Sequence, residues 1–174
     1  MKMIKRFAAV AMASGAMLAA APAAAAPVAV TGTKPQAKVT ILKPLVLTKV
    51  SDLDFGTVLL PDSVTGTLNV KVAQDGVMTC GTGLTCAATA ASVGSYNVKG
   101  TNNQVVRITA PKVTMTNATQ AGSIEVTLDA PGTVTLPNSG VNGVDFKVGG
   151  NFDITSATTD GVYSGDMNVT VDYF

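Results

Sequence analysis

The sequence contains no histidine and no tryptophan. Without histidine it has no Ser-His-Asp triad, no Cys-His pair, and no His-ligated zinc or haem. Charged residues are scarce, at 13% of the 174 residues, and basic and acidic side chains nearly balance. Nucleic-acid-binding proteins typically carry a basic patch, so we expect no nucleic-acid partner. We also expect no catalytic residue, no cofactor and no metal site, and therefore a protein that is not an enzyme.

The N-terminal segment has the three parts of a secretory signal peptide. Three cations within the first six residues precede an apolar stretch over residues 7–21, and a run of alanines follows. An apolar stretch of about 15 residues is shorter than the roughly 20 that span a bilayer. We place the cleavage after Ala25, which makes residues 1–25 the signal peptide. The sequence therefore predicts export through the periplasm to the cell surface, a fimbria or the medium, with no membrane span in the mature chain.

Cleavage changes the charge of the protein. It removes three of the 12 basic residues and leaves nine against 11 acidic residues, a net charge of −2. Residues 26–36 contain Pro27, Gly32 and Pro35 and are predicted to be a flexible leader. A single β-sandwich domain is predicted over residues 37–174, and residues 37–42 are either its first strand or a donor strand.

The only two cysteines are Cys80 and Cys86, with two glycines between them. In an exported chain, an even pair at short spacing indicates a disulfide, and the glycines allow the loop to bend. A zinc site needs about four ligands, and no other cysteine or histidine is available. We therefore predict a structural disulfide that holds a loop or hairpin end.

The mature chain is rich in valine and threonine and contains one glutamate, which favours strands over helices. Apolar and polar residues alternate over four segments, as in half-buried strands: residues 37–41, 67–72, 123–129 and 166–173. Further strands are predicted at residues 54–60, 95–99, 104–109, 112–115, 133–136 and 144–155. Turn signals fall between them, at residues 100–103, 129–132, 137–140 and 159–161. Short strands at this spacing predict an all-β fold of the immunoglobulin-like β-sandwich type.

Three motifs occur in a characteristic order: Pro44-Leu45 to Leu53-Asp54-Phe55-Gly56, then Val148-Gly149-Gly150, then Gly161-Val162-Tyr163-Ser164-Gly165 before the last alternating strand. In this order the chain resembles the domain-of-unknown-function 4402 family of exported Gram-negative proteins, over about residues 37 to 174. It resembles more distantly the spore-coat-U-type pilins of archaic chaperone–usher systems. Those pilins carry a cysteine that residues 42–53 of this chain lack.

The pilin resemblance implies an incomplete sandwich that a donor strand from another subunit completes. The donor candidates are Ala37, Val39 and Ile41, with Val28 and Val30 as a second candidate. The C-terminal strand that would pair with a donor carries Met167, Val169, Val171 and Tyr173 on its apolar face and Phe174 at its end. The implied partners are other copies or related subunits in a filament, a periplasmic chaperone and an outer-membrane usher.

Two hypotheses follow for the function. The first is an exported structural subunit of a fimbria-like surface filament that assembles by donor-strand complementation. The second is a monomeric secreted or periplasmic binding module, for carbohydrate or surface adhesion, in which residues 37–42 are the first strand of a closed sandwich. Purified protein distinguishes them, because a pilin is unstable or polymeric without its chaperone.

Two further features have simple interpretations. Asp52 and Asp54 lie two residues apart and suit either a Ca²⁺ site or a catalytic pair, but such residues are more often a turn in which Asp52 bonds the backbone. Arg107 is the one arginine left after cleavage, and we interpret it as an exposed strand charge.

Overall fold

The structure is a computed structural model, and it describes residues 25–87, 90–137 and 142–174. Except for Ala25, the predicted signal peptide lies outside the described residues. Backbone contacts divide the chain into two units, Met1–Val39 and Thr40–Phe174. In the first unit, residues 25–39 form no strand and their side chains are exposed.

The second unit is all-β, as predicted. Within the described ranges, no helix has the length and apolar character needed to cross a membrane. The strands in the described residues are β1 (Val46–Ser51), β2 (Thr57–Leu59), β3 (Leu68–Val72), β4 (Met78–Cys80), β5 (Thr85–Ala87), β6 (Gly94–Lys99), β7 (Val105–Thr109), β8 (Val113–Asn117), β9 (Ser123–Asp129), β10 (Thr133–Thr135), β11 (Val144–Ile154), β12 (Tyr163–Ser164) and β13 (Thr170–Tyr173).

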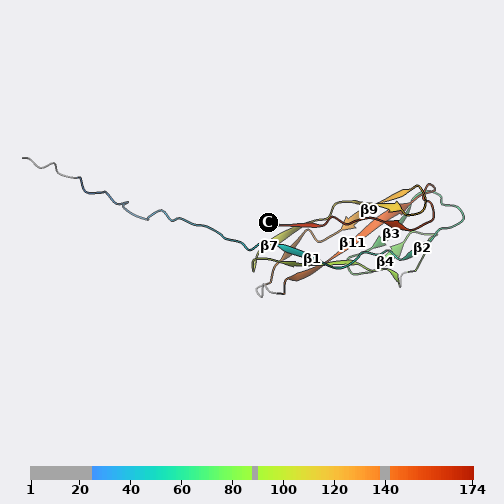
Figure 1. Cartoon of the computed structure of the whole chain (residues 1–174), viewed down its shortest axis with the longest axis horizontal. Helices are drawn as coiled ribbons and strands as arrows, with labels where there is room; N and C mark the ends of the chain where they lie inside the picture. The colour runs from blue at the N-terminus through green and yellow to red at the C-terminus, as the bar shows by residue number, and fades with distance from the viewer. Residues whose placement is uncertain (1–24, 88–89, 138–141) are drawn as a thin grey trace, which may run out of the picture. The chain divides into compact units, whose positions relative to one another are not determined.

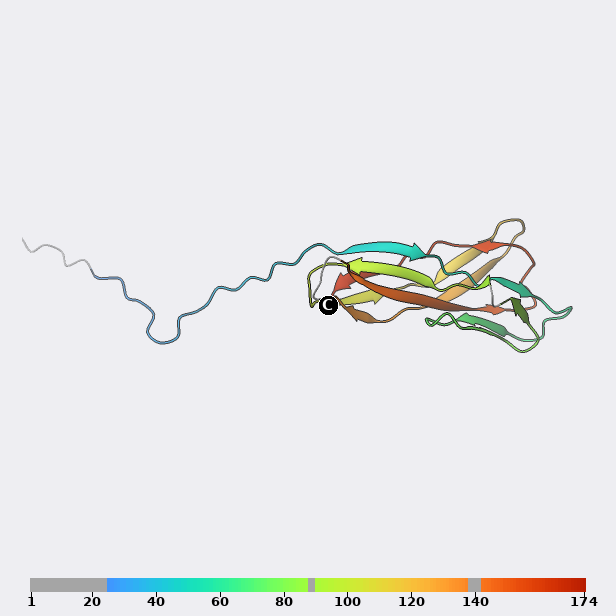
Figure 2. The same cartoon turned by 90° about the horizontal axis from the view of Figure 1, so that it is seen from below.

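Strand β11 is the centre of the largest sheet and runs along much of the second unit (Figures 1 and 2). Its N-terminal half pairs with β6, its middle with β9 and its C-terminal half with β3, all antiparallel. Strand β6 pairs in turn with β1, and β9 pairs with β8. The resulting order, β1-β6-β11-β9-β8-β12, leaves β1 at one edge of the sheet.

The C-terminal residues form edges of both larger sheets: β12 is the opposite edge of the large sheet, and β13 is an outer strand of the three-stranded sheet β10-β7-β13. Strand β12 pairs with β8 from Tyr163 opposite Asn117, and β13 pairs with β7 as far as Tyr173 opposite Val106. Because β7 and β8 follow one another along the chain, residues 163–173 run antiparallel along both. We call residues 163–173 the C-terminal run. Its middle, residues 165–169, lies in no ladder, and the neighbouring segment there contains Pro111, which has no N–H to donate.

The sandwich arises because side chains of the three-stranded sheet β10-β7-β13 pack in one cluster with side chains of β6 and β11 in the large sheet. Buried side chains alternate with more exposed ones along β6, β7 and β9, and along β11 outside residues 148–150, as in period-two patterning. They form two buried clusters. The first comprises Tyr96, Val98, Val106, Ile108, Leu136, Phe146 and Val148, and the second comprises Val70, Val113, Ile124, Val126, Phe152 and Ile154.

The Gly149-Gly150 pair lies where β11 changes its partner from β6 to β3. A Cβ atom on Gly149 would clash with the carbonyl oxygen of Val72 on β3. A Cβ atom on Gly150 would lie 3.2 Å from Leu53 and from Val126. The motif therefore allows close approach of neighbouring segments, which is a structural role.

Three sequence-based predictions of strands are wrong in detail. The predicted strand at residues 166–173 is reduced to β13, Thr170–Tyr173. Residues 37–41 alternate but form no strand, and the first strand is β1, which the alternation did not identify. The predicted strand at residues 54–60 is reduced to β2 and an isolated bridge between Asp54 and Ser92. Alternation indicates which face a segment can bury, whereas a strand also needs a neighbouring backbone for its hydrogen bonds.

Candidate functional site

The candidate site is the pair of strand edges, β1 and the C-terminal run, that pack on one buried cluster, and we call the interruption in the strand order between them the gap. Both edges pack on the same buried cluster, β1 through Leu47 and the C-terminal run through Met167, Val169 and Val171. Among the described residues, β1 pairs only with β6 and β13 only with β7, so each strand has one edge without a ladder partner. The site is therefore an interruption in the strand order with apolar side chains beneath it.

The inward side chains along the gap are only half-buried. This holds for Leu47 on β1 and for Met167, Val169 and Val171 on the C-terminal run, whereas the cluster beneath is closed, with Val98, for example, 0% exposed. A completed sandwich would bury such residues on both edges. The sequence predicted the apolar face of the C-terminal run but did not assign Leu47 to the site, although this residue lies within the first quoted motif.

One end of the gap is closed by the hydroxyl group of Tyr173. This hydroxyl donates to the carbonyl oxygen of Lys43 at 2.6 Å and accepts from the backbone N–H of Thr101 at 2.8 Å. The backbone N–H of Lys43 in turn donates to the Thr101 hydroxyl at 2.6 Å. Residue 43 is therefore attached to both the C-terminal run and the β6–β7 turn just before β1 begins. Sequence reasoning missed this contact, because the partners are far apart in the chain.

An apolar cavity of about 560 Å³ is lined by the segment that follows β1 in the chain and by the loop that leads into the C-terminal run. One wall is the segment after β1, including Phe55 and Val58, and the opposite wall is the loop of residues 158–163, just before the C-terminal run. Phe55 makes an edge contact with Phe152 in the floor, with ring centroids 4.9 Å apart. The sequence did not predict this cavity, because its walls and floor come from separate parts of the chain.

The charged side chains of residues 160–173 themselves all have one sign, although Arg107 on β7 lies opposite Asp172. Asp160, Asp166 and Asp172 are exposed there, and residues 160–173 contain no basic residue. Arg107 lies on the neighbouring β7 with its guanidinium 4.8 Å from the centre of the Phe174 ring. Arg107 is exposed, as predicted, and Phe174 is 79% exposed rather than part of the core.

The donor candidates Ala37, Val39 and Ile41 all lie outside strands and are exposed. Val39 is 80% and Ile41 84% exposed, and Val28, in the second candidate pair, is 95% exposed. Apolar side chains at this exposure gain little from the hydrophobic effect. Residues 37–42 are therefore not the first strand of the sandwich.

The aspartate pair has a structural role that differs in detail from the prediction. It is Asp54, not Asp52, whose carboxylate accepts a backbone hydrogen bond, from the N–H of Gly56 at 2.8 Å. The Asp52 carboxylate accepts from the Lys49 ammonium at 2.8 Å, and this hydrogen bond raises the pKa of Lys49. Within the described part of the chain, no group of three or more acidic, Cys or His side chains is placed to bind a metal ion.

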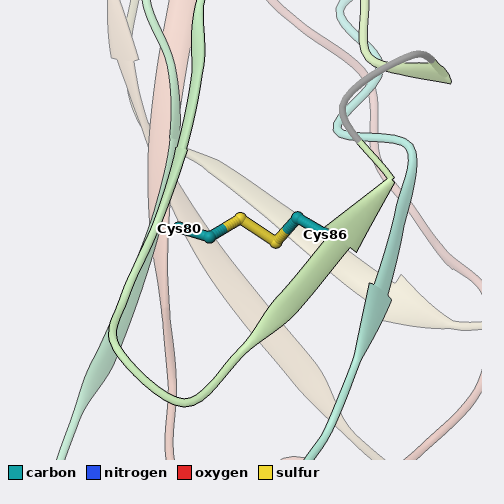
Figure 3. Close-up of a disulfide and its surroundings, with 2 residues drawn as sticks. All are labelled: Cys80 and Cys86. Carbon is teal, nitrogen blue, oxygen red and sulfur yellow. A yellow bond between two sulfur atoms is a disulfide. The ribbon is translucent and has the colours of Figure 1, made fainter.

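The predicted disulfide between Cys80 and Cys86 is confirmed. It bridges from β4 to β5 (Figure 3). Within the part of the chain that the structure describes, strand β5 pairs only with β2, and Cys86 lies directly opposite Val58 in the cavity wall. Cys80 lies directly opposite the fully buried Val70 on β3. The disulfide therefore connects the cavity wall to the core.

Comparison with known proteins identifies one family. No curated protein and no solved structure matches the chain. The family model described as "Domain of unknown function (DUF4402)" matches residues 45–173, which include both edges of the gap, the cavity walls and the disulfide. The chain therefore belongs to the DUF4402 family.

Proposed function

We propose that this protein is an exported structural subunit of a fimbria-like filament that assembles by donor-strand complementation, without catalysis. The observation that supports this proposal best is the gap between β1 and the C-terminal run, where two edges lie over half-buried apolar side chains. Exposed edges of this kind favour association with other strands. An added strand would supply both the ladder bonds and the missing apolar contacts.

The leader supplies a segment with the properties of a donor. Residues 26–42 carry exposed valines and Ile41 but no acidic residue, and they include Lys34 and Lys38. If Val39 and Ile41 point into the gap of a second copy, Lys38 points outward by the period-two rule. The C-terminal run has the complementary pattern, with Val169 and Val171 inward and its aspartates outward.

The remaining parts of the proposal rest on the sequence. The N-terminal segment resembles a signal peptide, and the disulfide suits an oxidising compartment. We extend the proposal to an immunoglobulin-like sandwich similar to the spore-coat-U-type pilins. The partners would be further copies or related subunits, with a periplasmic chaperone and an outer-membrane usher during export.

Light scattering and negative-stain microscopy of the purified mature chain test assembly. We expect polymers from the unaltered chain and monomers from the double variant Val39→Asp/Ile41→Asp, because a charged donor face cannot enter an apolar gap. Thr40→Asp is the matched control, since Thr40 points to the opposite face, and it should still assemble.

Peptide binding tests the gap directly. A synthetic peptide of residues 26–42 should raise the melting temperature of the Val39→Asp/Ile41→Asp chain, whose gap remains intact. At a peptide concentration about 100 times Kd, the stabilisation should be about 2.7 kcal/mol. The same peptide carrying Val39→Asp should have no effect. A cooperative monomer that ignores the peptide would show a closed binding module instead and would overturn the proposal.

A further inference from the structure

The apolar cavity of about 560 Å³ has an exposed apolar rim. Leu59 on β2 is 60% exposed, Val162 on the opposite loop is 70% exposed, and Leu60 is 38% exposed. The floor consists of Met115, Ile124, Phe152 and Ile154 from β8, β9 and β11. Large apolar side chains around an apolar hollow are typical of a surface that another molecule covers.

The two walls of the cavity are adjacent in sequence to the two edges of the gap. Its first wall follows β1 directly in sequence, and its second wall, residues 158–163, leads directly into the C-terminal run. A strand that enters the gap from a second copy therefore passes the mouth of the cavity.

The length of the leader identifies the occupant. At about 3.3 Å per residue, the 17 residues 26–42 extend to about 56 Å, and the 11 residues of the C-terminal run to about 36 Å. Residues 37–42 alone extend only about 20 Å, so they leave part of the gap uncovered. The full leader is long enough to cover the gap and reach into the cavity.

Charge supports the same occupant. Asp54 and Asp160 lie at the cavity and are exposed. Residues 26–42 contain Lys34 and Lys38 and no acidic residue. Apolar side chains beside lysines therefore match an apolar hollow beside aspartates.

The wall that carries Leu59 is attached to the rest of the fold by the disulfide and by the packing of Phe55 and Val58 on the second buried cluster. Strands β2 and β5 form a separate ribbon of three residue pairs, and in the described residues no ladder joins this ribbon to the large sheet. A two-stranded ribbon of this size is marginally stable by itself. The Cys80–Cys86 bond attaches it to β4 and, through the β3–β4 ladder, to the large sheet.

We propose that this cavity receives apolar side chains from the leader of a second copy, and that only the disulfide-bonded chain presents it. This inference rests on the proposed function and adds two things, a second contact beyond the ladder edges and a requirement for oxidation. A chain that has not reached an oxidising compartment would then lack part of its docking surface.

Photo-crosslinking tests the contact. The experiment uses the mature chain with Val39→Asp/Ile41→Asp, and the probe is the peptide of residues 26–42. A benzophenone side chain replaces either Val162 on the cavity rim or Asp172 on β13. We expect crosslinks from both positions in the oxidised chain. Leu59→Asp should weaken the Val162 crosslink about tenfold, which corresponds to about 1.4 kcal/mol, and leave the Asp172 crosslink in place. Val77→Asp is the matched control, because Val77 is 57% exposed and lies away from the cavity.

The Cys80→Ser/Cys86→Ser variant tests the requirement for oxidation. We expect this variant to lose the Val162 crosslink and to keep the Asp172 crosslink, which serves as the control for a folded gap. Reduction of Cys80 and Cys86 with dithiothreitol should have the same selective effect. A crosslink at Asp172 alone in the oxidised chain would overturn the cavity contact and leave the proposed function standing. A Val162 crosslink that survives loss of the disulfide would overturn the oxidation requirement. If the oxidised chain forms no crosslink at either position, the proposed function is overturned as well.

Discussion

Aromatic side chains illustrate how single residues contribute to this protein. Tyr96 on β6 stacks against Phe146 on β11, with ring centroids 5.5 Å apart, and both residues are buried. Burial raises the pKa of the Tyr96 phenol above its ordinary value of 10.0, because the ionised form loses its hydration, and the Asp52 carboxylate adds to the effect.

The raised pKa predicts a loss of stability in alkali. The folded state holds the phenolic proton more tightly than the unfolded state does, so the free energy of unfolding falls as pH rises through about 10 and above. Tyr96→Phe removes this group, and its stability should fall less steeply from about pH 9 to about pH 11, around the ordinary phenol pKa. Urea unfolding at several pH values measures the difference. Parallel pH profiles for the two chains would contradict the expectation.

At the scale of the element, β11 shows how two glycines allow one strand to serve two neighbours. It pairs with β6 and then with β3, and the change occurs at Gly149 and Gly150. The sequence identifies this pair as part of a motif but assigns it no role. The structure shows why both positions are glycine: a Cβ atom on either one would crowd the neighbouring segments.

Gly149→Ala should therefore be destabilising. The added methyl group meets the backbone of Val72 and Ala73 rather than a flexible side chain, so we expect a loss of about 1–3 kcal/mol or more. Gly132→Ala is the matched control, because open space surrounds Gly132, and it should change stability by about 0.5 kcal/mol at most. Equal stability of the two variants in urea unfolding would show that β3 yields to the methyl group.

The first strand shows what alternation predicts and what it does not. Residues 37–41 have the better period-two pattern, yet β1 at Val46–Ser51 forms the strand. The ladder between β1 and β6 extends from Val46 opposite Lys99 to Ser51 opposite Ser95. Long-range pairing of this kind depends on which backbone is available, and local patterning contains no such information.

At the scale of the whole molecule, the proposed assembly depends on opposite charges as well as apolar contact. The leader is basic, and the C-terminal side of the gap is acidic. Ions screen exposed charges, with a Debye length of about 10 Å at 0.1 M salt and about 3 Å at 1 M.

We therefore expect assembly to be slower at high salt and slower in Lys38→Glu. Lys147→Glu makes the same change in net charge at an exposed position on β11, and it should have a smaller effect than Lys38→Glu. The rate of polymer growth followed by light scattering measures both. Equal effects of the two substitutions would show that only the net charge matters, not the position of the leader lysine.

Local composition, spacing and period-two alternation were enough to predict the all-β class, the disulfide between Cys80 and Cys86, and the apolar face of the C-terminal run. Only the folded chain shows that residues 37–41 are exposed and that Leu47 and Val171 pack on one cluster from two different edges. The same holds for the contact of Tyr173 with Lys43 and for the cavity beyond β1. An edge, a gap and a cavity are relations between segments far apart in the chain, and they exist only once the long-range ladders have formed.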